Sequence, residues 1–334
     1  MPNPGLHLAV EIDGDGAHPA ASRRADPLAV SRRVRAVAAI AENAGFTLAT
    51  VDDEPSNSGI GAVERAAFIA AATSTLGIVP TVSTTYTEPF HVSSQLASID
   101  HISVGRAGWL VSESTAAETA RAWGRPLVDD TRREARDATR VVRDLWDSWE
   151  DDAVVRDVAT SRYLDRDRLH YIDFVGETFS VKGPAIVPRS PQGQLVVFAP
   201  ADLLPPELVD VTLTSETTRA ATPLTFTEIE VALSTPQATA GERIAELGPW
   251  PERGRLRYAG SADGLVALLT DLAGAVDGVR LHPLVLNEDL AVLSQLVVPA
   301  LIRGGVAARP IPGASLRTTL GLPRPVSRFQ ESAR

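Results

Sequence analysis

The stretch TVSTTYTEPFHVSSQLASIDHISVGRAGWLVSES, residues 81–114, decides the fold class of this chain. Its pattern predicts a strand, a polar loop, a helix and a second strand in that order. Polar side chains follow both strands, with Ser83 and Thr84 after the first and Ser114 after the second. This arrangement places groups that are capable of chemistry on one rim of a parallel sheet.

The same alternation of strand and helix extends on both sides of this stretch. Residues 6–12 predict a short buried strand, and residues 28–44 predict a helix that Gly45 ends. Residues 46–51 and 61–75 predict the next strand and helix. The other predicted elements are a long helix at 130–149, strands at 195–199, 209–215, 224–234 and 276–283, and a last helix at 287–303. Repeated units of this kind imply a parallel sheet with right-handed crossovers.

A chain of 334 residues suits one α/β barrel with insertions. Residues 150–194 are rich in turns and short extended runs, which is typical of an insertion. We therefore predict a single (β/α)₈ TIM-barrel domain over residues 1–334, with an insertion after the fourth strand, residues 150–194, that covers the barrel rim. The tail 314–329 contains Pro and Arg with little apolar periodicity, so we expect it to wrap the outside of the core.

The composition narrows the possible functions. No apolar run approaches the roughly 18 to 20 residues that cross a bilayer, and the first residues lack the pattern of a signal peptide, so we expect a cytoplasmic protein without membrane contact. A formal net charge of -10 disfavours nucleic acid as a partner. The absence of cysteine excludes disulfides and thiolate chemistry, and Lys182, the only lysine, leaves little room for Schiff-base chemistry.

Side chains at the ends of the predicted strands are the candidates for chemistry, because barrel enzymes place their active sites there. His282 follows the last strand and is the candidate catalytic residue, with a capping role before Pro283 as the alternative. The hydroxyls of Ser83 and Thr84 either face a ligand or bond to backbone groups at the strand end. Asp53 is either a ligand contact or part of a solvated acidic turn. The histidines lack the tight spacing of metal ligands, so we predict no metal site.

Several separated segments match sequence motifs of one enzyme family. In chain order they are STTY (83–86), EPFH (88–91), ASIDH (97–101), GRAGW (105–109), LWDSWEDDAVV (145–155), FSVKGP (179–184), PRSPQG (188–193) and RTTLGLPRPVSRF (317–329). The set resembles the luciferase-like flavin-dependent monooxygenases, in the branch of nitrilotriacetate monooxygenase. Several separated segments in matching order are more specific than one short motif, because the probability that all of them match by chance is the product of their separate probabilities.

The resemblance implies a cofactor and a reaction. Such an enzyme would hold reduced FMN, or a deazaflavin, at the carboxyl ends of its barrel strands. The flavin would react with O₂ to oxygenate a small organic substrate, while a separate flavin reductase supplies the hydride. By the same resemblance, Asp53, Ser83, Thr84 and Ser114 would contact the flavin. A homo-oligomer, or a heteromer with a paralogue, is also implied, with the helices after the second and third strands as the contact.

Other positions depart from the family pattern. Leu110 stands where the family has asparagine, Glu113 replaces a threonine, Arg132 a tyrosine and Phe174 a histidine. The family's glycine-rich phosphate loop is replaced by VFAPADLLPPEL, residues 197–208, whose prolines lack the N–H groups that bind a phosphate. These departures imply a degenerate flavin site. They favour two alternatives: a non-catalytic subunit beside a catalytic paralogue, and a barrel that has lost flavin binding and takes another small ligand, with Arg132 as the anion partner.

Overall fold

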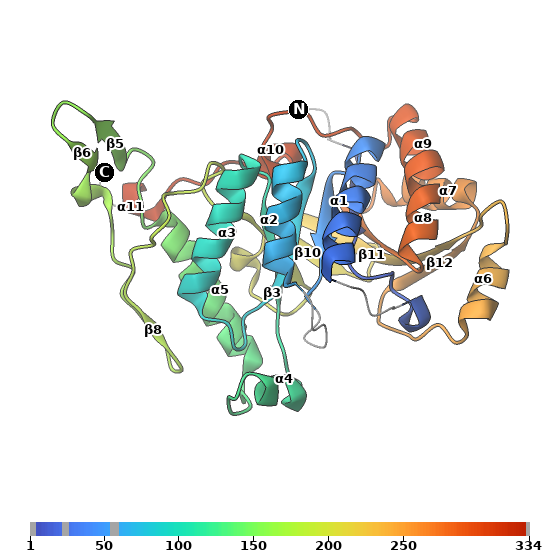
Figure 1. The fold of residues 1–334 in the computed structure, drawn as a ribbon, viewed down its shortest axis with the longest axis horizontal. Helices are drawn as coiled ribbons and strands as arrows, with labels where there is room; N and C mark the ends of the chain where they lie inside the picture. Colours follow the sequence, from blue (N-terminus) through green and yellow to red (C-terminus); the bar gives the residue numbers. More distant parts are fainter. Residues whose placement is uncertain (1–4, 22–26, 54–59, 332–334) are drawn as a thin grey trace.

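Eight parallel strands close into a barrel in the computed structural model, which describes residues 5–21, 27–53 and 60–331 (Figure 1). The strands are β1 (His7–Glu11), β2 (Leu48–Val51), β3 (Gly77–Ser83), β4 (Gly108–Ser112), β9 (Val196–Pro200), β10 (Val211–Thr214), β11 (Leu224–Leu233) and β13 (Gly278–Pro283). They pair in this order, β13 pairs with β1, and the pairing of β10 with β11 completes the circle. The predicted (β/α)₈ barrel with an insertion after its fourth strand is confirmed.

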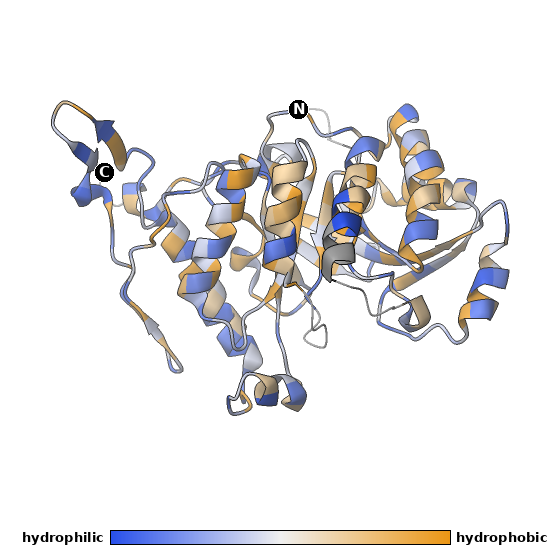
Figure 2. Ribbon diagram, in the orientation of Figure 1, coloured by the Kyte–Doolittle hydropathy of each residue, from blue (hydrophilic) through white to orange (hydrophobic). Residues whose placement is uncertain are grey.

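Helices surround the barrel and bury apolar residues in a common core with the strands. Figure 2 shows how apolar and polar residues alternate along these helices. The α-helices within the described residues are α1 (Pro27–Ala44), α2 (Ala62–Ala72), α3 (Pro89–Ser103), α4 (Ala117–Ala122), α5 (Thr131–Asp147), α6 (Ala240–Leu247), α7 (Ala262–Leu272), α8 (Leu286–Val292) and α9 (Val298–Arg303), with the short helices α10 (Leu316–Thr319) and α11 (Arg328–Glu331) in the C-terminal tail. The described crossovers from β9 to β10 and from β10 to β11 contain no α-helix. None of the helices in the described ranges is long and apolar enough to span a membrane.

The strand β11 pairs with three strands, whereas a strand of a closed barrel needs only two neighbours. Its residues 224–227 pair with β10, whereas residues 229–233 pair with β12 (Leu256–Gly260), a ninth parallel strand outside the circle. The sequence pattern did not predict β12, because Arg257 and Ala259 are exposed and the other residues of β12 are only half-buried. A short strand without a buried face gives little hydrophobic signal.

The inner apolar cluster is completed by the C-terminal tail. Phe198 and Phe226 meet edge to face inside the barrel with ring centroids 6.1 Å apart. Leu316 of α10 and Leu320, the residue that follows this helix, join the same cluster, each 1% exposed, at the amino ends of the strands. The expectation that the tail wraps the outside of the core is therefore wrong for this part. Ser315 caps the short helix by accepting the N–H of Thr318 at 3.1 Å, and this helix brings the two leucines onto one face.

The insertion 150–194 lies along one side of the barrel (Figure 1, green). It contains two antiparallel hairpins, of β5 (Val154–Asp157) with β6 (Arg162–Leu164) and of β7 (Phe174–Val175) with β8 (Ser180–Val181). Its buried side chains Ile172, Val181 and Ala185 pack with Val141 and Leu145 of α5. That the insertion covers the rim, and that the chain forms one domain, stay predictions.

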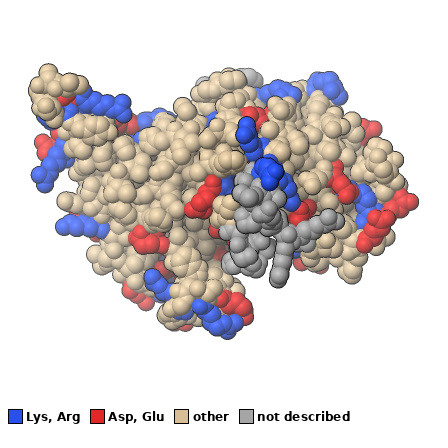
Figure 3. Space-filling model, viewed as in Figure 1, with Lys and Arg blue, Asp and Glu red and all other residues tan. Residues whose placement is uncertain are grey.

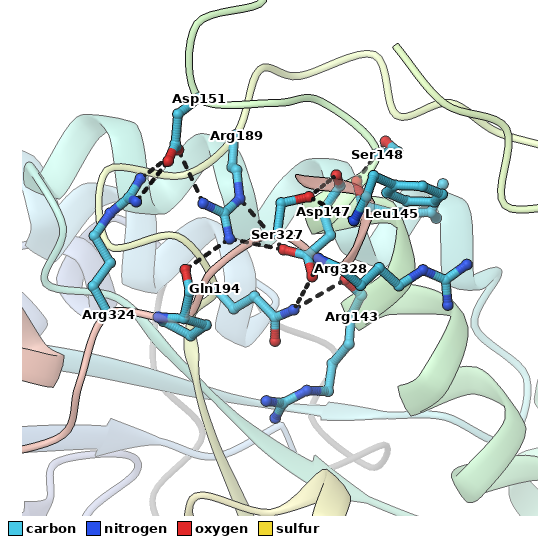
Figure 4. Close-up of polar contacts among 12 residues, drawn as sticks. Arg143, Leu145, Asp147, Ser148, Asp151, Arg189, Gln194, Arg324, Ser327 and Arg328 are labelled. Carbon is cyan, nitrogen blue, oxygen red and sulfur yellow. Dashed lines mark hydrogen bonds and ion pairs between the residues drawn. The ribbon is translucent and has the colours of Figure 1, made fainter. Parts of the chain in front are cut away.

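A cluster of ion pairs fastens the C-terminal tail to the end of α5 and to the insertion (Figure 4). The buried carboxylate of Asp147 accepts from Arg189 Nη2 at 2.9 Å. Asp151 accepts from the same guanidinium at 2.9 Å and from Arg324 Nη2 at 2.6 Å. We call these four residues the tail latch. It lies at the end of α5 that points away from the strand-end rim, so it supports the fold and leaves the rim free.

Candidate active site at the carboxyl ends of the strands

Charged side chains from three neighbouring strands meet inside the barrel, toward the carboxyl ends of the strands. Arg280 on β13 donates to Glu11 Oε2 at 2.5 Å, to Glu228 Oε1 on β11 at 2.8 Å and to Thr50 Oγ1 on β2 at 2.9 Å. His282 Nε2 lies 3.1 Å from the same Glu228 oxygen. We call these five residues the barrel network. Alternate residues of a strand share one face, so Arg280 and His282 point inward together.

The barrel network fixes the protonation state of its histidine. Burial and the charge of Arg280 lower the pKa of His282 to about 3, so the imidazole is neutral at neutral pH. Burial alone would raise the pKa of Glu228, but the hydrogen bond to His282 and the charge of Arg280 outweigh it and hold that pKa well below its usual range. Beside an ionised carboxylate, the imidazole proton belongs on Nε2, which leaves Nδ1 as an acceptor. His282 can therefore serve as a hydrogen-bond partner for a ligand.

A small cavity of about 160 Å³ lies above the barrel network. It is lined by Glu11, Asp52, Arg253, Arg255, His282, Pro283 and the loop 13–19 after β1. The loop is held over the cavity because His18 Nε2 contacts Pro249 O at 3.0 Å. Drug-sized ligands need roughly 300 to 1,000 Å³, so this cavity suits only a small polar group.

A second group of polar side chains lies at the ends of β3 and β4. Thr84 donates to Ser112 O from its backbone N at 2.9 Å and from its hydroxyl at 3.1 Å. Thr85 Oγ1 accepts the N–H of Ser114 at 2.8 Å, and Thr85 N donates to Ser83 Oγ at 3.3 Å. These bonds clamp the two loops together. The hydroxyl of Thr84 is used by the fold, whereas Ser83 and Ser114 remain half-buried at the rim.

Two buried hydroxyls near the same strand end have no hydrogen-bond partner within the described structure. They are Thr81 Oγ1 and Tyr86 OH. Thr81 shares the inward face of β3 with Val79, because these positions are two residues apart. An unpaired buried hydroxyl costs about 1 to 3 kcal/mol, so a water or ligand that pairs with it is favoured. These two hydroxyls are therefore candidates to pair with a water or a ligand near the end of β3.

The loop after β9 has few backbone donors to offer. Pro200, Pro205 and Pro206 have no N–H. Four other residues in and next to this loop have N–H groups that already donate to backbone carbonyls: Ala201, Leu203, Leu208 and Val209. Backbone binding of a phosphate requires neighbouring free N–H groups, and the described loop does not provide such a run.

Some of the family-like motifs serve the fold at the opposite end of the barrel. Asp100, which is fully buried, accepts from Ala107 N at 3.0 Å and from Gln192 Nε2 at 2.6 Å, and it also accepts from Ser190. One carboxylate therefore joins the ASIDH, GRAGW and PRSPQG segments next to the first residues of β4. In this chain the three segments therefore pack against one another, away from the carboxyl ends of the strands.

The structure places the predicted site residues on one rim, in separate groups. Ser83, Thr84 and Ser114 lie together in the clamped loops. Asp53 is exposed after β2, where its carboxylate accepts the N–H of Ala62 at the start of α2. His282 lies below the rim in the barrel network. Their roles as flavin contacts or as a catalytic group stay predictions.

Sequence reasoning missed the charged partners of His282. Glu228 and Glu230 flank Ile229, and Arg280 and His282 flank Leu281, inside strands whose apolar residues are buried. This alternation was a usable signal. When the apolar residues of a barrel strand face the helices, the residues between them must face the interior.

Comparison with known proteins agrees with this architecture. Residues 9–248 match the family model described as luciferase-like monooxygenase. Nitrilotriacetate monooxygenase component A of Aminobacter aminovorans is 43% identical over 134 residues, which cover 39% of this chain and 30% of that protein. A subunit of pristinamycin IIA synthase from Streptomyces pristinaespiralis is 37% identical over 171 residues, which cover 50% of this chain and 56% of that protein. The matches span less than two thirds of either relative.

A solved structure supports the fold over the whole length. The crystal structure of long-chain alkane monooxygenase superimposes with a TM-score of 0.80 and covers 96% of both chains, at 18% sequence identity. That identity supports a likeness in fold alone. The family model, in contrast, matches well over half of the sequence, including the motifs quoted above up to residue 193. The chain belongs to the luciferase-like monooxygenase family.

Proposed function

We propose that this chain is the oxygenating component of a flavin-dependent monooxygenase, which acts on a small organic substrate with O₂ and with reduced flavin from a separate reductase. Family membership supports the reaction class. The name of one relative, a component A, supports the division between two proteins. The observation that carries the proposal is the pair of unpartnered hydroxyls, Thr81 and Tyr86, at a strand end where barrels of this type bind ligands.

The residues at the end of β3 suit the polar edge of a flavin ring. That edge carries C=O and N–H groups, which the hydroxyls of Thr81 and Tyr86 can pair with as donors or acceptors. Ser83 and Ser114 add two half-buried hydroxyls beside them. When bound, a reduced flavin supplies the electrons with which O₂ is activated. The small cavity then receives a polar group of the substrate, and His282 orients it as a neutral hydrogen-bond partner.

Fluorescence titration with FMN, oxidised and then reduced under anaerobic conditions, tests this proposal. We expect saturable quenching at micromolar concentration. Thr81→Val keeps the shape of the side chain and removes its hydroxyl, so binding should weaken about tenfold, which corresponds to about 1.4 kcal/mol. Ser98→Ala, an exposed position on α3, is the control and should bind like the parent. A parallel titration with a deazaflavin identifies the cofactor, and the absence of any response at millimolar concentration of either sinks the proposal.

The second candidate is a non-catalytic subunit that stabilises a catalytic paralogue. Two observations favour it. The barrel network occupies the interior of the barrel with the chain's own charged side chains. The loop after β9 lacks a run of free N–H donors for a phosphate. One relative also bears the name of a subunit. Co-expression with a homologous chain separates the candidates. The subunit proposal expects a stable complex, a higher melting temperature of the homologue and no flavin bound to this chain.

A further inference from the structure

A larger cavity separates the start of α5 from the loop after β9. Its volume is about 590 Å³. The lining residues are Asp130, Arg132, Arg133, Arg136, Asp202, Leu203, Leu204 and Pro205. We call it the arginine cavity. It shares no lining residue with the small cavity above His282, and it opens at the end of the barrel where α4 and the start of α5 lie (Figure 1).

Three arginines line this cavity from two adjacent turns of one helix. Arg132 and Arg136 are four residues apart, and Arg133 and Arg136 are three apart, so their side chains are neighbours on the helix surface. Like charges at these spacings destabilise a helix by about 0.2 to 0.5 kcal/mol per pair. A bound anion that bridges these side chains would relieve the repulsion between them.

Two of the arginines pair with carboxylates outside the cavity lining, and Asp130 and Asp202 also line the cavity. Arg133 pairs with Glu177 at 2.7 Å, and Arg136 Nε lies 3.3 Å from Asp137. Arg132 forms no hydrogen bond or ion pair with any residue that the structure describes. Asp130 already accepts the N–H of Arg133 at 2.9 Å as the helix cap. Each guanidinium carries five donors, so most of the donors in the cluster are still available.

We propose that the arginine cavity binds a phosphate monoester through Arg132, Arg133 and Arg136. Planar guanidinium groups form paired, charge-assisted hydrogen bonds with phosphate oxygens. The positive end of the 17-residue helix α5 adds to the attraction. The volume exceeds what an inorganic phosphate fills, which favours an organic phosphate. The apolar wall of Leu203 and Leu204 suits its carbon part.

This site deepens the proposed function and rests on it in one respect. The phosphate monoester is either the phosphate end of FMN or that of a free phosphorylated metabolite, and the chemistry of recognition is the same for both. In the first case side chains of α5 replace the backbone donors that the loop after β9 lacks. In the second case the cavity is a site of its own.

Calorimetric titrations with FMN, riboflavin and phenyl phosphate distinguish these cases. The variant Arg132→Ala/Arg136→Ala is compared with Arg140→Ala, an exposed arginine of the same helix outside the cavity. We expect the double variant to bind FMN or phenyl phosphate at least tenfold more weakly than the parent, and Arg140→Ala to bind like the parent. Riboflavin, which has no phosphate, should bind both variants and the parent alike. Circular dichroism confirms that each variant is folded.

Each outcome decides one of the two proposals. Arginine-dependent binding of phenyl phosphate without binding of FMN or riboflavin supports the site and overturns the flavin function. Equal binding of FMN to the parent and to the double variant overturns the site and leaves the flavin function intact. If no phosphate compound binds, the site is also overturned. Asp202→Asn removes a negative charge from the opposite wall and should strengthen arginine-dependent binding, most clearly at low ionic strength.

Discussion

His282 couples the stability of the barrel to pH. Its pKa falls from 6.5 to about 3 on folding, so the unfolded chain takes up a proton at higher pH than the folded chain does. Its contribution is therefore fully present above pH 6.5 and is lost as pH falls from there toward 3. The slope is at most about 1.4 kcal/mol per pH unit. Between pH 6.5 and 5, urea denaturation should show a loss of about 2 kcal/mol from this residue.

The variant His282→Gln isolates the contribution of His282 to the pH dependence of the free energy of unfolding. Glutamine can still donate a hydrogen bond to Glu228 but does not titrate. The free energy of unfolding of the parent should therefore fall more steeply with decreasing pH than that of the variant. His7 is also buried, with a pKa lowered to about 4, but it is present in both proteins and cancels. Parallel curves for the two proteins would show that His282 is not held neutral by its surroundings.

Glu228 is the carboxylate of the barrel network that contacts both Arg280 and His282. It accepts from Arg280 at 2.8 Å and lies 3.1 Å from His282, and Arg255 lies 3.8 Å away. Glu228→Gln keeps the shape and removes the charge, which leaves Arg280 with Glu11 as its ionic partner. Breaking a buried pair in this way costs about 3 kcal/mol, measured as the free energy of unfolding. Glu246→Gln, an exposed control on α6, should change it by less than about 0.5 kcal/mol.

The tail latch contains a buried ion pair, an exposed ion pair and the contact of Arg189 with Asp151 that links the two. The side chains of Arg189 and Asp147 are 2% and 5% exposed, whereas those of Arg324 and Asp151 are 46% and 37% exposed. Arg189→Met leaves a buried carboxylate without its charged partner, so it should cost about 3 to 5 kcal/mol. Arg324→Met removes a screened surface pair and should cost about 0 to 1 kcal/mol. Urea denaturation measures both, and similar losses would contradict the assignment of Asp147 as the buried anchor.

The elements differ in how far the sequence predicts them. The strands β1 to β4 are buried on both faces and form short, mainly apolar runs, whereas the long helix α5 buries one face and shows apolar periodicity. The strand β12 has no buried face, and α10 is a single turn in a segment rich in Pro and Arg. Such short elements are stabilised by tertiary contacts, which the local pattern does not contain.

The position of the candidate site could be predicted from the sequence, whereas the side chains that its residues contact could not. Ser83, Thr84 and His282 follow predicted strands, so their place on the rim could be inferred. Glu11 and Arg280 are 269 residues apart and become neighbours only when β13 pairs with β1 in a defined register. The local sequence contains no information on that register. The same holds for Thr84, whose hydroxyl is used by a carbonyl of the next strand.

The surface over α3 carries few charged side chains, although the chain as a whole has a formal net charge of -10. Figure 3 shows this face over α3, where the exposed residues His91, Ser98, His101 and Ile102 include no lysine, arginine, aspartate or glutamate. Phe68 on α2 is 44% exposed and Ile102 is 50% exposed. A face with large exposed apolar side chains and few charges is typical of a protein contact.

We predict that the chain associates through α2 and α3, with a second copy or with a paralogue. Analytical ultracentrifugation of the purified chain should show a dimer that strengthens as ionic strength rises, because salt screens the repulsion between two negative chains. Phe68→Glu with Ile102→Glu places carboxylates in the contact and should yield a monomer. Val158→Glu, at a 91% exposed position in the insertion, is the matched control and should remain dimeric. A parent chain that stays monomeric alone and with a co-expressed homologue rules out this contact, because both partners would then have been offered to the face.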